Sequence, residues 1–130
     1  TCALPISHRM DGCPPAAYVK LSKAKAQTCI GVQNSSRGFR EKYTASGEAP
    51  RFTQAAAMVT ATGGQLAPIA GGVLIKDSEG AVLGSVGVSG AAADEDEFSV
   101  SANGGSGGVA RLTFGSALSN GDGLIIWYYH

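Results

Sequence analysis

The sequence contains few of the residues that build common metal, redox and membrane sites. Its 130 residues include only three cysteines and two histidines, and the cysteines form no Cys-x-x-Cys pair. Because the histidines stand at positions 8 and 130, the paired histidines of a zincin helix are excluded. The longest apolar run is far shorter than the about 20 residues that span a bilayer, so we expect no membrane partner.

The chain also lacks an excess of charge of either sign. Ten basic and ten acidic residues give a net charge of zero, which argues against binding to nucleic acid through phosphate neutralisation. The basic residues lie mainly in the first half, and many of the acidic ones lie later. This separation suits self-association by opposite faces, although two solvated surfaces are the simpler interpretation.

Motifs for covalent catalysis and phosphate binding are missing too. The stretch from Gly84 to Gly87 contains a serine, but it lacks the spacing of a nucleophile elbow and falls within an expected strand. No glycine-rich phosphate loop is present. We assign no catalytic residue, and we keep His8 as a candidate ligand of haem iron beside the simpler interpretation of an exposed residue.

The first seven residues do not look like a secretory signal. They contain neither a charged segment nor a long apolar segment, and they match what one frame of a sequencing-library adapter would encode. We therefore expect residues 1–7 to be a non-native leader. The compartment, cytoplasmic or secreted, stays open.

The next part of the chain, residues 14–64, contains sequence patterns typical of helices. Pro14 and Pro15 begin a glycine-free run that predicts a helix over residues 14–30, with small side chains on its packing face and Lys20, Lys23 and Lys25 on the others. Residues 34–36 predict a cap for a short helix through Tyr43 and also form a glycosylation sequon at Asn34, a use we rank below capping. Residues 44–64 are expected to be mostly loop.

The clearest local pattern is a β-hairpin. Apolar runs over residues 73–75 and 81–88 flank a turn at residues 77–80 that ends in glycine. Gly84 and Gly87 leave gaps on the two faces of the second strand. A gap accommodates either a closely packed helix, the interpretation we favour, or a ligand lying over the strand.

The C-terminal part is less regular. Residues 91–97 predict the start of a helix with four carboxylates, and residues 103–108 have the composition of a flexible linker. Residues 110–118 and 124–129 are expected to form a final hairpin.

Several of these motifs together resemble the GlcG/HbpS family, also called the haem-degrading domain family. The matching segments, in order, are Arg-Met-Asp-Gly at residues 9–12, the Pro-Pro-Ala and Lys-Ala-Lys-Ala segments at 14–16 and 23–26, Gly-Gly-Val-Leu-Ile at 71–75, the glycine-rich strand at 80–90, and Asp-Glu at 96–97. The resemblance covers residues 8–102 and leaves residues 103–130 as a linker and tail of uncertain structure.

The resemblance implies a profilin-like α/β sandwich, in which helices cover an antiparallel sheet, and subunits that assemble into homo-oligomers. It also implies binding of haem or another small molecule rather than catalysis. The family's N-terminal helix and first strand are absent here, which would leave an open sheet edge for another chain or for a strand from the tail.

Three functional hypotheses result. The first is a non-enzymatic binding module for haem or a related ligand, with Arg9, Asp11, Gly84 and Gly87 as ligand-contacting residues; Arg9 suits a ligand carboxylate. The second is an enzyme or accessory subunit that acts on a small hydroxy acid or a carbon-source intermediate, with Asp11 as base. The third is a self-assembling structural subunit.

Overall fold

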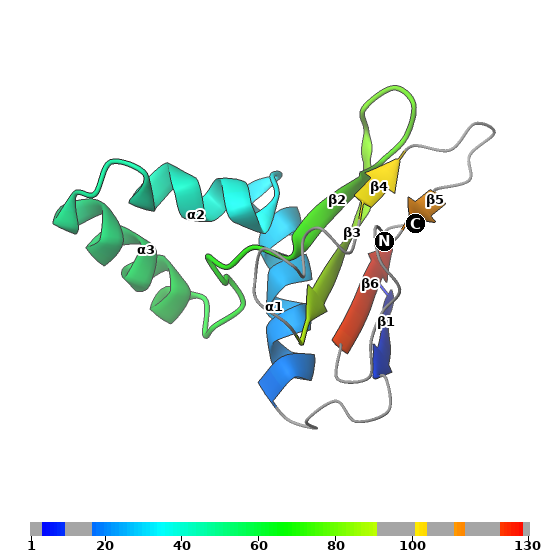
Figure 1. Ribbon diagram of the computed structural model, residues 1–130, viewed down its shortest axis with the longest axis horizontal. Helices are drawn as coiled ribbons and strands as arrows, with labels where there is room; N and C mark the ends of the chain where they lie inside the picture. The colour runs from blue at the N-terminus through cyan, green and yellow to red at the C-terminus, as the bar shows by residue number, and fades with distance from the viewer. Residues whose placement is uncertain (1–3, 10–16, 91–100, 104–110, 114–122, 129–130) are drawn as a thin grey trace.

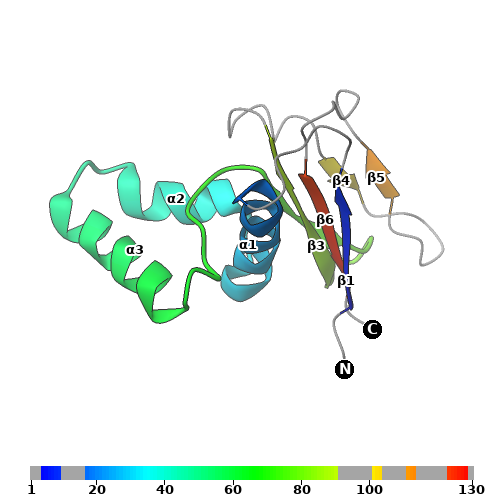
Figure 2. The same ribbon diagram turned by 90° about the horizontal axis from the view of Figure 1, so that it is seen from below.

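The computed structural model describes residues 4–9, 17–90, 101–103, 111–113 and 123–128. Its main sheet has the strand order β1-β6-β3-β2, and every neighbouring pair is antiparallel. Helix α1 covers one side of this sheet, and the small β4-β5 sheet lies on the other side (Figures 1 and 2). The expected α/β sandwich is confirmed.

The strands come from both ends of the chain. They are β1 (Leu4–Arg9), β2 (Gly72–Lys76), β3 (Val82–Ser89), β4 (Ser101–Asn103), β5 (Arg111–Thr113) and β6 (Gly123–Tyr128). The predicted β2-β3 hairpin is confirmed, and the Asp77 carboxylate closes its turn by accepting hydrogen bonds from the Glu79 and Ala81 amides at 2.9 and 2.8 Å. Gly80 takes the left-handed conformation there, with φ of 87°.

The pairing predicted for the tail is wrong. Strand β5 pairs with β4, whereas β6 pairs with β1 and β3 and lies between them. The uninterrupted apolar residues of β6 fit this position, because they are typical of a strand inside a sheet rather than one arm of an exposed hairpin. Strand β6 is thus the tail strand that extends the sheet beside β3.

Helix α1 (Ala17–Val32) lies directly on β3, β6 and β2. Its sheet-facing positions are small, since Ser22, Ala26 and Cys29 follow one another at spacings of four and three and are fully buried. Lys25 belongs to the same face and is only 2% exposed. The prediction that this lysine lies on a polar face is therefore wrong.

Helix α2 (Ser36–Thr44) begins where the sequence predicts. Ser35 is the N-cap, and its hydroxyl accepts a hydrogen bond from the Gly38 amide at 3.0 Å. The buried hydroxyl of Ser36 accepts a second one from the Gly72 amide at 2.8 Å. The first bond caps the helix, and the second ties its first turn to the start of β2.

Helix α3 (Ala49–Ala61) replaces the loop expected over residues 44–64, so that prediction is wrong. Pro50 stands in the first turn, where its fixed φ favours a helix, and the alanines that follow have the highest helix propensity. Only Ala55 is fully buried, so the helix lacks the apolar stripe that reveals most helices in a sequence. Gly63 and Gly64, at φ of 62° and 79°, end it.

Two expectations fall on residues that the structure leaves undescribed. The acidic helix start at residues 91–97 and the glycine linker after Asn103 lie outside the described residues. Strand β1 includes the last four residues of the predicted leader, and their non-native origin stays a prediction. Across the described ranges, no helix is both long and apolar enough to cross a membrane.

We predict that Ser35→Ala lowers the free energy of unfolding by about 1 kcal/mol, because one amide of the first turn of α2 loses its acceptor. Urea unfolding followed by circular dichroism measures this difference. Ser78→Ala, at an exposed position of the β2-β3 turn, is the control and is expected to stay within about 0.5 kcal/mol of the parent chain. Equal unfolding midpoints for the two variants would contradict the capping role.

Candidate functional site

The ligand-contacting residues predicted from the sequence spread over the main sheet rather than meeting at one point. Arg9 is opposite Gly123, which is opposite Ser89, so Arg9 lies at the end of the sheet where β3 finishes. With about 4.8 Å between strands, the backbones of Arg9 and Ser89 are about 10 Å apart. Gly87 lies two residues from this end.

Gly84 lies nearer the other end of the sheet. It is opposite Tyr128, which is opposite Leu4, five residues from Arg9 along β1. At about 3.3 Å per residue this separates the Gly84 and Arg9 levels by about 17 Å along the strands. His8 is level with Val88, and Asp11 lies outside the described residues. One small ligand would therefore not contact both Arg9 and Gly84.

Helix packing explains why residue 87 is a glycine. A Cβ atom at this position would lie 2.0 Å from the Ser22 carbonyl oxygen and 2.8 Å from the Ala26 nitrogen. The backbone of α1 thus occupies the gap on this face of β3, as the favoured interpretation of the sequence holds. Ligand contact at Gly84 and Gly87 stays a prediction.

Lys25 is a buried lysine whose side chain reaches the end of the sheet where Arg9 lies. Its Nζ atom donates a hydrogen bond of 2.8 Å to the Val88 carbonyl oxygen, near the end of β3. The sequence contains a sign of this burial. Lys25 stands three residues after Ser22 and four before Cys29, and these spacings put the three residues on the same face of α1. The bond joins the centre of α1 to the strand end that lies level with His8.

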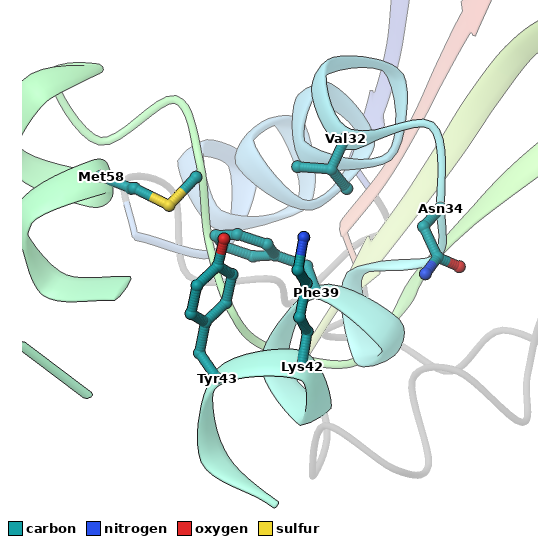
Figure 3. Close-up of a pocket in the computed structure, with 6 residues that line it drawn as sticks. All are labelled: Val32, Asn34, Phe39, Lys42, Tyr43 and Met58. Atoms are coloured by element: carbon teal, nitrogen blue, oxygen red, sulfur yellow. The ribbon is translucent and has the colours of Figure 1, made fainter. Parts of the chain in front are cut away.

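A pocket lies on the other side of α1, between the end of that helix, α2 and α3 (Figure 3). It has a volume of about 290 Å³. Its lining combines apolar, aromatic and polar side chains, namely Val32, Asn34, Phe39, Lys42, Tyr43 and Met58. Asn34 and Lys42 are exposed, so the pocket opens to solvent at these residues.

Two aromatic rings from α2 form the inner wall of this pocket. Phe39 and Tyr43 stand one turn apart, with ring centroids 5.4 Å apart and planes at 70°, the favourable edge-to-face arrangement. Both are buried, at 3% and 8% exposure, in the cluster that they form with Ala55. The one-turn spacing was visible in the sequence, but the third helix that completes the cluster was not.

Besides the exposed Asn34 amide, the pocket has two polar groups from neighbouring residues of α2, a phenol and an ammonium group. The Lys42 Nζ atom lies 5.5 Å from the centre of the Tyr43 ring, close enough for a cation-π contact. Figure 3 shows both side chains running in the same direction from α2, with the Tyr43 hydroxyl pointing into the space toward Met58 and Val32. An apolar wall and two hydrogen-bond donors thus face the same volume.

The pocket does not resemble a metal centre. Over the part of the chain that the structure describes, no three His, Cys, Asp or Glu residues gather closely enough to hold a metal ion. The two carboxylates of α2 and its following turn are paired with arginines, Glu41 with Arg37 at 3.8 Å and Glu48 with Arg51 at 3.1 Å.

Comparison with known proteins identifies the family. The family model described as "Haem degrading protein HbpS-like" matches residues 3–103, about three quarters of the chain. No curated protein and no solved structure matches the chain significantly. The match includes β1, the three helices and the β2-β3 hairpin, in the order that the motifs predicted. The chain therefore belongs to the HbpS-like haem-degrading family.

Proposed function

We propose that this protein is a binding domain for haem or a related small molecule, that it is not itself a catalyst, and that it works as a homo-oligomer. The observation that carries the proposal is the family match over residues 3–103. It supports a haem-related binding role for the domain.

The pocket between α1, α2 and α3 does not fit a whole haem. Its volume of about 290 Å³ is at the lower end of the range for small-ligand sites, roughly 300–1,000 Å³, and a porphyrin macrocycle is larger than this space. We therefore place the haem at the end of the sheet near Arg9 instead. There the Arg9 guanidinium would pair with a propionate.

The order of the strands supports self-association. Strands β1 and β2 are the edges of the main sheet, and within the described ranges β1 pairs with β6 alone. An edge strand offers a row of amide and carbonyl groups that a second copy of the chain can pair with. We propose that this edge contributes to the oligomer.

A haemin titration tests the proposed function. We expect a saturable shift of the Soret band on addition of the protein. Arg9→Gln should weaken haemin binding roughly tenfold, because a hydrogen bond to a charged group is lost.

The matched control is Arg40→Gln, which removes a guanidinium from α2, away from the sheet end. It should bind haemin as the parent chain does. An unchanged Soret band at saturating protein would overturn the haem proposal, and equal weakening by Arg9→Gln and Arg40→Gln would overturn the placement at Arg9.

A further inference from the structure

We propose that the pocket between α1, α2 and α3 is a second ligand site, which takes a small aromatic carboxylate. This inference goes beyond the proposed haem function and does not depend on it, because the pocket lies on the side of α1 away from the sheet (Figures 2 and 3).

The hydroxyl of Tyr43, which belongs to a largely buried residue, is the observation that points to a ligand. Tyr43 is only 8% exposed, yet its hydroxyl makes no hydrogen bond with any residue that the structure describes. Buried phenol groups normally find a partner, because a buried donor without one loses free energy relative to water. Since this hydroxyl points into the pocket, a ligand acceptor there would satisfy it.

The Lys42 ammonium group favours a negatively charged ligand. Both nearby carboxylates, Glu41 and Glu48, are engaged with arginines. Over the described chain, Lys42 contacts the Tyr43 ring and forms no salt bridge. A ligand carboxylate at the pocket mouth would accept hydrogen bonds from both the ammonium and the phenol groups.

The walls favour an aromatic body for this ligand. The Phe39 ring, the Met58 thioether and the Val32 methyl groups line the same space as the two donors. Aromatic edges and thioether sulfur both make favourable contacts with a further ring. The volume of about 290 Å³ is at the lower end of the range for small-ligand sites, which suits a single ring with a short acidic group.

Benzoate is the probe for this site, and benzamide is its uncharged counterpart. Two-dimensional NMR of the full chain, with the Met58 methyl group as reporter, should show saturable shifts on addition of benzoate. Benzamide should bind several-fold more weakly, since it lacks the charge that Lys42 recognises. Raising the salt concentration should weaken benzoate binding and leave benzamide binding unchanged.

Two variants remove one donor each and keep the walls. Tyr43→Phe keeps the ring and should weaken benzoate binding roughly tenfold, the loss of one hydrogen bond to a charged group. Lys42→Gln removes an exposed charge and should weaken it about two- to fivefold. Tyr18→Phe and Lys20→Gln on α1 are the matched controls, and both should bind benzoate as the parent chain does.

Circular dichroism confirms that each variant is folded before the titrations are compared. The inference is overturned if benzoate causes no saturable shift of the Met58 methyl signal. It is also overturned if Tyr43→Phe binds benzoate as tightly as Tyr18→Phe. If Tyr43→Phe loses haemin binding in the Soret titration, the two sites are one, which contradicts a separate carboxylate site.

Discussion

Gly87→Ala is expected to unfold the domain or to cost it about 3 kcal/mol or more of its free energy of unfolding, the upper range for overpacking. The added methyl group would lie 2.0 Å from the Ser22 carbonyl oxygen and 2.8 Å from the Ala26 nitrogen. Both atoms belong to the backbone of α1, so no rotation of a side chain can make room. The helix itself has to move away from the sheet.

A second glycine restricts that movement. A Cβ atom at Gly72 would lie 2.6 Å from the Lys25 carbonyl oxygen and 2.8 Å from the Cys29 sulfur. Gly72 is opposite Gly87 in the β2-β3 ladder, so the two glycines form one flat area under α1. Lifting the helix at Gly87 therefore disturbs its contact with β2 as well.

Thermal unfolding followed by circular dichroism measures the effect, with Gly31→Ala as the matched control. At Gly31 the added methyl group would meet only the Leu66 side chain, at an ordinary 3.4 Å. Because alanine favours the helix by about 0.5–1 kcal/mol over glycine, this control should be neutral or stabilising. A Gly87→Ala protein as stable as Gly31→Ala would show that α1 does not press on β3.

Elements with strong local signals were predictable from the sequence. The serine cap of α2 and the Asp77–Gly80 turn each depend on a few neighbouring residues, and both stand where expected. Helix α3 was missed because its alanines favour a helix but its sequence shows no clear apolar repeat. The pairing of β6 was missed because it joins residues far apart in the chain, which local spacing does not determine.

The pocket was likewise only partly predictable, because it joins helices that are separate in the sequence. Phe39 and Tyr43 stand one turn apart in a helix that the sequence predicts, so their contact was visible. Met58 comes from α3, and without that helix it reads as a residue of a loop. The predicted ligand residues, in contrast, came from the glycine gaps of the hairpin and from the Arg-Met-Asp-Gly turn, and the register separates Arg9 from Gly84 along the sheet.

The burial of Lys25 leads to the second large effect. Lys25→Ala is expected to lower the free energy of unfolding by about 3 kcal/mol, because it leaves a cavity and removes a donor from the Val88 carbonyl. Lysine and glutamate are almost never fully buried unless they are paired, and this lysine is 2% exposed. Its aliphatic stem and its terminal hydrogen bond therefore both contribute to holding α1 on β3.

Lys25→Met separates these two contributions. Methionine keeps much of the volume of the buried stem and removes the charge, so its cost should be about 1 kcal/mol, the value of one lost hydrogen bond. Lys20→Ala, at an exposed position five residues earlier in α1, is the control and should change stability by less than about 0.5 kcal/mol. Urea unfolding of the three variants ranks them. Equal losses for Lys25→Ala and Lys25→Met would assign the effect to the polar interactions of the Lys25 amino group, which include the hydrogen bond with Val88. Equal midpoints for Lys25→Ala and Lys20→Ala would contradict burial of this side chain.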